Sequence, residues 1–219
     1  MKKVIILTAS PRKYWNTAQT LKEAQKGAEF AGAEVEYINL VDLNFKGCMS
    51  CFACKRKGAN LGGLCAWKDD LRLVLEKIVN ADAVIIGSPV YYSSPTGMFR
   101  ILLERMLFAA GTYMIDENGR HMRNLTHTIP VGLIFTMNVP ENLMEQYNYP
   151  TLLGVNEMCL NMVYGHCETL YICDTYQFSD YSKYDCNMFN AEHKKTVKET
   201  KFPKDLEKAY DLGKRLVEI

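Results

Sequence analysis

The chain has 219 residues, 48% of them hydrophobic and 23% charged, which is the composition of a folded globular protein and not of a disordered one. Its 26 basic and 25 acidic residues leave a net charge of +1, so no overall field attracts nucleic acid or an anionic membrane. No apolar run approaches the roughly 20 residues that a membrane span requires. We therefore expect one domain over residues 1–219, with no nucleic-acid or membrane partner.

The first apolar run, residues 3–8, predicts a buried strand, because it is too short for the apolar region of a secretory signal. Residues 16–32 carry apolar or small residues at helical spacing and predict the first helix. Residues 34–40 alternate in polarity and predict a second, less buried strand. The segment 48–65 contains three glycines and predicts a loop.

Residues 69–80 predict the next helix, with its apolar residues on one face. The run AVIIG at 83–87 predicts a central strand of the sheet. Pro95 suits the first turn of a helix over 95–110. Residues 111–128 are interpreted as an inserted excursion, because they contain a cluster of turn-forming residues.

Further along the chain we predict a strand over 129–136, a helix over 142–165 and a strand over 168–173. From residue 174 the sequence is polar and aromatic with little periodicity, which indicates a less regular extension before a closing helix over 205–217. Strands that alternate with helices are typical of an open, doubly wound parallel sheet in the α/β class. Such sheets bind ligands beyond the carboxyl ends of their strands.

The first strand leads through hydroxyl, amide and basic side chains into a helix, and the relevant residues are Ser10, Arg12, Asn16 and Thr17. A helix N-terminus with such neighbours favours an anion, because its free amides and its dipole both attract negative charge. The run lacks the patterns G-x-x-x-x-G-K and G-x-G-x-x-G, which indicates a monophosphate rather than a nucleoside triphosphate or a dinucleotide. The alternative is an ordinary turn in which Asn16 caps the helix.

The third strand leads into the sequence GSPVYYSSPTG at residues 87–97. Its prolines limit flexibility and its tyrosines offer flat apolar faces, which suits a planar ring. The alternative is a rigid turn with two surface tyrosines. Met137 and Asn138 follow the fourth strand and can close over the same ring.

The patterns S-x-R-x-x-x-N-T and G-S-P-V-Y-Y-S-S-P-T-G together resemble the NADPH-dependent FMN reductase family of the flavodoxin-like superfamily, over about residues 1 to 140. The resemblance implies a flavodoxin-like five-stranded sheet of order 2-1-3-4-5. It also implies FMN as the cofactor, with NADPH or NADH as the electron donor. Hydride transfer to a flavin requires no acid–base side chain, so we name no catalytic residue.

By the same resemblance, the FMN phosphate is held by Ser10, Arg12, Asn16 and Thr17. The ring is lined by Pro89, Val90, Tyr91, Tyr92 and Ser93, with Met137 and Asn138 at its far edge. Many relatives have small residues near the positions of Tyr14 and Trp15, which here can give the phosphate loop a lid.

Four of the eight cysteines form the pattern C-x2-C-x2-C-x10-C at Cys48, Cys51, Cys54 and Cys65. Because they follow the second strand, we expect them near the same sheet edge. The compact part resembles the cluster loop of iron–sulfur flavoproteins, which implies a [4Fe-4S] cluster. Two features depart from that pattern: the last interval is long, and no proline follows the fourth cysteine. A zinc site is one alternative, and free thiols on a glycine-shaped loop are the preferred one.

The leading functional hypothesis is an enzyme, an FMN-dependent NAD(P)H oxidoreductase that reduces a small quinone, nitroaromatic or flavin acceptor. The alternative is an electron-transfer protein of the iron–sulfur flavoprotein type, although carrier flavodoxins tend to be acidic and this chain is nearly neutral. A flavin- or metal-binding regulator without turnover is the third hypothesis.

Three further expectations concern surroundings and surface. The resemblance implies a homodimer or homotetramer. Cysteines in a chain without a secretory signal predict a reducing cytoplasm. The lysines of the C-terminal extension, Lys194, Lys195, Lys198 and Lys201, are interpreted as a solvated face.

Overall fold

The computed structural model describes residues 1–219, and its centre is a parallel sheet with the strand order β2-β1-β3-β7-β8. These strands are β1 (Lys3–Thr8), β2 (Glu34–Asn39), β3 (Ala83–Tyr91), β7 (Val131–Thr136) and β8 (Cys167–Ile172). In chain order they are the five parallel strands of the sheet, to which one short antiparallel strand is added beside β3, so the predicted order 2-1-3-4-5 is confirmed. β1, β3 and β7 are buried on both faces, which explains their continuous Val, Ile and Leu runs.

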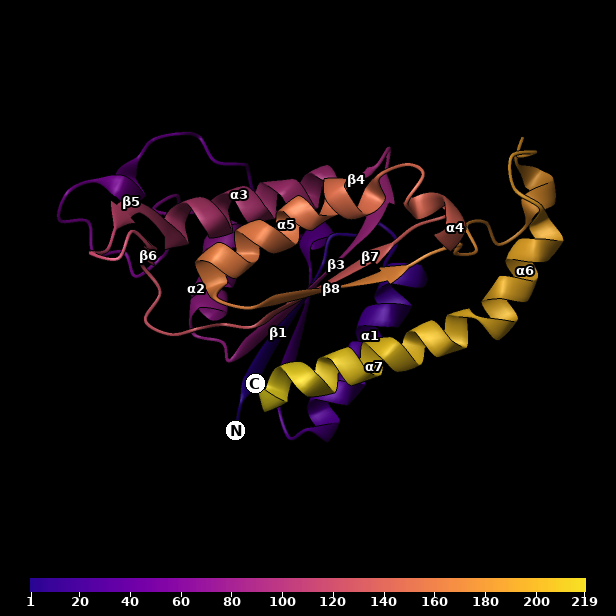
Figure 1. Ribbon diagram of the computed structural model, residues 1–219, viewed down its shortest axis with the longest axis horizontal. Helices are drawn as coiled ribbons and strands as arrows, with labels where there is room; N and C mark the ends of the chain where they lie inside the picture. The colour runs from indigo at the N-terminus through magenta and orange to yellow at the C-terminus, as the bar shows by residue number, and fades with distance from the viewer.

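Helices cover both faces of the sheet (Figure 1). One face packs against α1 (Asn16–Phe30) and α7 (Phe202–Glu218), with Leu21 and Leu212 in their shared core. The other face packs against α2 (Asp70–Val79), α3 (Gly97–Ala110) and α5 (Tyr149–Tyr164). The doubly wound α/β architecture is therefore confirmed.

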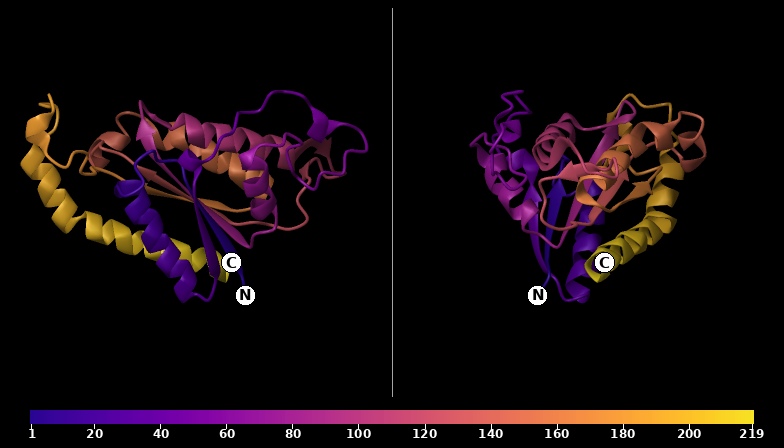
Figure 2. Two further views of the ribbon diagram at one scale, coloured as in Figure 1. Left: turned by 180° about the vertical axis from the view of Figure 1, so that it is seen from behind. Right: turned by 60° about the vertical axis from the view of Figure 1, so that its left-hand side comes forward.

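Helix α7 brings the end of the chain back beside α1, as both views in Figure 2 show. The two backbones approach closely at Gly27 and Gly213. A Cβ atom on Gly27 would lie 1.9 Å from the carbonyl oxygen of Tyr210, and one on Gly213 would lie 1.9 Å from that of Ala24. Only glycine permits this approach, and it ties the C-terminal extension to the sheet.

The region after the central strand differs from the prediction. β3 continues to Tyr91 and pairs with the short strand β4 (Ser94–Pro95), so Pro95 lies in a hairpin and not in the first turn of a helix. The helix α3 begins at Gly97, because the Thr96 hydroxyl accepts a hydrogen bond from the Phe99 amide at 3.3 Å. Proline tolerates this position because it lies in an edge hairpin.

The later elements agree with the prediction except in the extension. The excursion after α3 is a hairpin of β5 (Gly111–Ile115) and β6 (His121–Arg123). The helix predicted over 142–165 is divided into α4 (Glu141–Met144) and α5. The extension contains a helix that the sequence did not predict, α6 (Ala191–Thr200). No helix combines the length and the apolar character that crossing a membrane would require.

Candidate functional site

The carboxyl ends of β1, β3, β7 and β8 surround a hollow that we call the strand-end pocket. Its lining residues are Ser10, Arg12, Trp15, Asn16, Thr17, Pro89, Val90, Tyr91, Thr136, Met137, Asn138, Thr175 and Gln177. The position is the one at which open α/β sheets bind their ligands. Nine of the eleven residues predicted to contact FMN line this pocket.

The phosphate loop after β1 is held in shape by its own hydrogen bonds. The buried Ser10 hydroxyl accepts from the Arg12 amide at 3.1 Å, and the Thr17 hydroxyl lies 2.7 Å from that of Thr136. Burial lowers the pKa of Arg12, while Tyr91 and Tyr184 act in the opposite direction. The loop therefore presents hydroxyls and a guanidinium to one end of the pocket.

The N-terminus of α1 opens onto this loop without a side-chain cap. Its N-cap residue is Trp15, and no side chain bonds to the first amides of the helix. Asn16 is the first residue of the helix, and its side-chain amide donates to the carbonyl oxygen of Tyr176 at 2.9 Å. The alternative interpretation, with Asn16 as the cap, is therefore wrong. Uncapped first-turn amides are suited to an anion.

The loop after β3 contributes Pro89, Val90 and Tyr91, but the lining ends there. Tyr92 and Ser93 form the turn of the β3–β4 hairpin with φ angles of 48° and 63°. The Tyr92 side chain is fully exposed. Neither residue is among those that line the pocket, so their contact with the ring stays a prediction.

The fourth wall was missed by sequence reasoning and comes from the segment after β8. Thr175 and Gln177 line the pocket. The carbonyl oxygen of Gln177 accepts from the Arg12 guanidinium at 2.8 Å, and that of Tyr176 accepts from the Trp15 indole at 3.0 Å. The sequence could have indicated this wall, because the segment follows a parallel strand and so begins at the same edge of the sheet.

One polar atom in the pocket is buried and has no partner. Asn138 donates from its side-chain amide to the Gln177 side-chain oxygen at 2.7 Å, while its own side-chain oxygen accepts no hydrogen bond. A buried unpaired acceptor costs free energy unless a ligand satisfies it. The ring N–H groups of a flavin are donors of the required kind. An uncapped helix N-terminus and a free buried acceptor in one pocket fit FMN.

The four clustered cysteines all line a second hollow, which we call the cysteine hollow. It is lined by Gly47, Cys48, Met49, Cys51, Phe52, Cys54, Cys65, Ala66, Trp67, Arg105, Phe108 and Ala109. Burial raises the pKa of the Cys54 thiol, with smaller contributions from Lys55 in the opposite direction and from Cys65 and Cys48 in the same direction. No three His, Cys, Asp or Glu side chains come close enough in this structure to hold a metal ion.

The cysteine hollow does not lie at the sheet edge where we expected it. At the N-terminus of α3, the Thr96 hydroxyl donates to the Ala9 carbonyl oxygen beside the strand-end pocket, whereas Phe108 and Ala109 reach the cysteine hollow from the other end. A helix of 14 residues is roughly 21 Å long. Figure 1 shows the purple loop beside β5 and β6, away from the tips of β7 and β8.

Arg105 contributes to this placement, since it holds both flanks of the cysteine loop against α3. Its guanidinium donates to the carbonyl oxygens of Lys46 at 3.2 Å and Trp67 at 3.0 Å, and it pairs with Asp69 at 2.5 Å. Burial alone would lower the pKa of Arg105, but the hydrogen bond to Asp69 and the nearby Cys65 thiol outweigh burial and raise it. Its Nε atom is buried without a partner.

We compared the chain with known protein families, curated proteins and solved structures. The sequence model of the NADPH-dependent FMN reductase family matches residues 2–136. An iron-sulfur flavoprotein of Methanocaldococcus jannaschii is 35% identical over 103 residues, 47% of this chain and 51% of that protein. One from Archaeoglobus fulgidus is 37% identical over 114 residues, 52% and 53% of the two chains. This chain thus spans about half the length of the curated relatives it matches.

Two solved structures show the same fold over nearly the whole chain. The NAD(P)H:quinone oxidoreductase from Methanothermobacter marburgensis has a TM-score of 0.68 and 16% identity, with 98% of this chain and 96% of that one covered. The FMN-dependent NADH-azoreductase of Bacillus anthracis in complex with FMN has a TM-score of 0.66 and 11% identity, with 99% and 100% covered.

Proposed function

The chain belongs to the NADPH-dependent FMN reductase family, and on that premise we propose that it is an FMN-dependent NAD(P)H oxidoreductase acting on a small acceptor. The observation that carries the proposal is the strand-end pocket, where nine residues expected to contact FMN lie together. When bound, FMN would accept a hydride from the nicotinamide and pass the electrons to a quinone, nitroaromatic or flavin.

The residues of the chain have binding and orienting roles in this proposal. Ser10, Arg12, Asn16 and Thr17, with the first amides of α1, hold the phosphate. Pro89 to Tyr91 support one side of the ring, and Met137 and Asn138 meet its polar edge. Tyr91 is half exposed, so an acceptor can stack beside it.

The proposal is tested by titrating the purified chain with FMN and with riboflavin, followed by anaerobic NADPH oxidation in the presence of a quinone. We expect FMN to bind more tightly than riboflavin, because only FMN carries the phosphate that the loop is built to receive. Turnover should require both FMN and the quinone. Equal affinity for the two flavins, or no binding of either, would contradict the proposal.

A second candidate function is electron transfer through a metal centre in the cysteine hollow. It is favoured by the convergence of Cys48, Cys51, Cys54 and Cys65 on one hollow and by the iron–sulfur flavoprotein relatives. These four thiolates would hold a [4Fe-4S] cluster, which supplies one-electron chemistry. The positive charge of Arg105 beside Cys65 suits an anionic thiolate centre.

Iron and sulfide assays on protein purified without oxygen test this candidate. About four irons per chain that are lost in Cys65→Ser, and retained in Cys186→Ser, would support a cluster. Zinc without iron would indicate a zinc site instead. Protein free of any metal would leave the four residues as free thiols.

We further propose that the chain forms one FMN-binding domain and assembles as a homodimer or homotetramer in a reducing cytoplasm. All eight cysteines are free. The outer face of α5 exposes Leu152, Val155, Met158 and Met162 at helical spacing, which is an apolar stripe of the kind that subunits bury. Light scattering should show an oligomer that Met158→Lys dissociates, and a monomeric parent protein would contradict the assembly.

A further inference from the structure

One wall of the strand-end pocket is built from two segments, one after β7 and one after β8. Their backbones stay paired beyond the sheet. The Asp174 amide donates to the Val139 carbonyl oxygen at 2.9 Å, and the Thr175 amide donates to that of Met137 at 3.0 Å. Asn138 lies between these contacts, so its position depends on how firmly the two segments are held.

Behind this wall lies Lys194, whose side chain is 1% exposed. Its ammonium group donates to the carbonyl oxygen of Asn138 at 2.6 Å and to a carboxylate oxygen of Asp174. The other carboxylate oxygen of Asp174 lies 2.7 Å from Nε2 of His193. Asp174 has a φ angle of 63°, which is unfavourable for a residue with a side chain and is maintained here by these partners.

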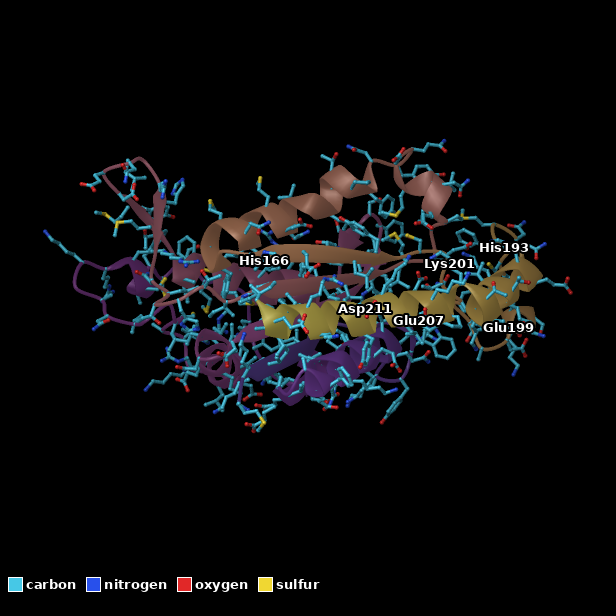
Figure 3. All side chains as sticks on the ribbon, turned by 60° about the horizontal axis from the view of Figure 1, so that its bottom comes forward. His166, His193, Glu199, Lys201, Glu207 and Asp211 are labelled. Carbon is cyan, nitrogen blue, oxygen red and sulfur yellow. The ribbon has the colours of Figure 1, made fainter.

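The N-terminus of α6 places the side chains of His193 and Lys194 beside Asp174. Asn190 caps it, because its side-chain oxygen accepts from the His193 amide at 2.9 Å. His193 and Lys194 therefore occupy the first turn, and Figure 3 shows His193 at that end of the helix, with Lys201 near its other end. Burying the lysine is costly unless its charge is paired, and Asp174 supplies the pair.

These contacts hold the backbone carbonyl oxygen and the side-chain NH2 group of Asn138 and leave its side-chain oxygen free. Lys194 holds its carbonyl oxygen, Gln177 accepts from its side-chain amide at 2.7 Å, and its side-chain oxygen is buried and unpaired. We propose that Lys194 is a positioning residue that fixes Asn138 so that this oxygen accepts a hydrogen bond from a ring N–H of the flavin. The inference rests on the proposed function of the strand-end pocket.

All the residues that do the positioning lie beyond residues 2–136, the part of the chain that matches the family model. In this proposal α6 supports the flavin site from behind, although none of its residues lines the pocket. A hydrogen bond to the ring changes in strength with the oxidation state of the flavin, so its loss shifts the midpoint potential.

The test compares Lys194→Met with Lys195→Met, which removes the neighbouring, exposed lysine from the same helix. Hydrogen exchange is measured at the Asp174 and Thr175 amides without flavin, and the FMN dissociation constant and midpoint potential are then determined. We expect Lys194→Met to accelerate exchange, to weaken FMN binding about tenfold and to shift the potential. Lys195→Met should match the parent protein in all three.

Gln177→Leu provides a second variant in case Lys194→Met does not fold, because Gln177 is exposed and carries no buried charge. It frees the Asn138 side chain from the other side, so it should also shift the potential. Unchanged exchange and affinity in Lys194→Met, or an unchanged potential in Gln177→Leu, overturns the inference. A parent protein that binds no FMN contradicts the proposed function and with it the flavin contact, whereas the exchange data still decide whether Lys194 holds the wall.

Discussion

The strand-end pocket and the cysteine hollow lie at opposite ends of α3, and they are organised in different ways. Backbone pairing of the parallel strands brings the walls of the strand-end pocket together, and its side chains are already fixed by hydrogen bonds. The cysteine hollow is formed by a loop, and its thiols line one space without being gathered for a metal ion. A sheet edge thus orders a site before its ligand arrives, whereas a loop depends on a few side-chain ties.

The largest expected effect comes from breaking the main tie of the loop. Arg105→Met leaves Asp69 without its buried partner, so the free energy of unfolding should fall by about 3–5 kcal/mol in urea titrations. Arg100→Met is the matched control on the same helix, because the Arg100 side chain is 66% exposed and lies 3.5 Å from Glu104. Its effect should stay below about 0.5 kcal/mol. Equal effects for the two variants would contradict the role given to Arg105.

Thiol reactivity should sharpen the comparison. Cys173 lies 2% exposed at the end of β8, and burial raises its pKa to about 12, whereas Cys51 in the cysteine hollow is exposed. A raised pKa means that little thiolate is present at pH 8. Iodoacetamide should therefore label Cys51 at least about a hundred times faster than Cys173 in metal-free protein, as followed by peptide mass spectrometry. Comparable rates would show that the strand-end region opens as readily as the loop.

A smaller effect is expected from removing one charge from the strand-end pocket. Arg12→Ala should raise the FMN dissociation constant by about 10- to 100-fold in calorimetry, because a charged hydrogen bond to the phosphate is lost. Lys13→Ala removes the adjacent charge, which pairs with Asp42 at the surface at 2.5 Å, and should change the constant less than about twofold. If the two variants weaken binding equally, the effect is one of general charge and not of the pocket.

The sequence predicted the ordered region better than the loop. Continuous runs of β-branched residues predict buried parallel strands, and their carboxyl ends then locate Ser10, Arg12, Asn16 and Asn138 at one edge. The spacing of the cysteines predicted that they lie together, but not where. Their position depends on Arg105, an arginine among the apolar residues of α3 that no local pattern distinguishes from a surface residue.

The interpretation of the lysines as a solvated face is wrong for Lys194 for a related reason, whereas Lys195 and Lys198 are exposed as expected. Polar residues dominate this helix, so its sequence indicates a solvated face, and only Lys194 and Val197 are buried. The burial of Lys194 depends on Asp174, which lies 20 residues earlier in the chain. Long-range pairing of this kind leaves no periodic signal. The hairpin with Tyr92 and Ser93 at its turn was not predicted, because it depends on pairing between β3 and β4.

The most direct test of the central claim is the visible spectrum of protein purified without oxygen, recorded before and after NADPH is added, with iron and sulfide assayed on the same sample. If the chain is an FMN-dependent reductase, we expect flavin bands near roughly 370 and 450 nm that bleach with NADPH. A broad shoulder near roughly 400 nm with about four irons per chain would add the electron-transfer role of the cysteine hollow. A colourless protein that takes up no flavin on reconstitution would contradict the account.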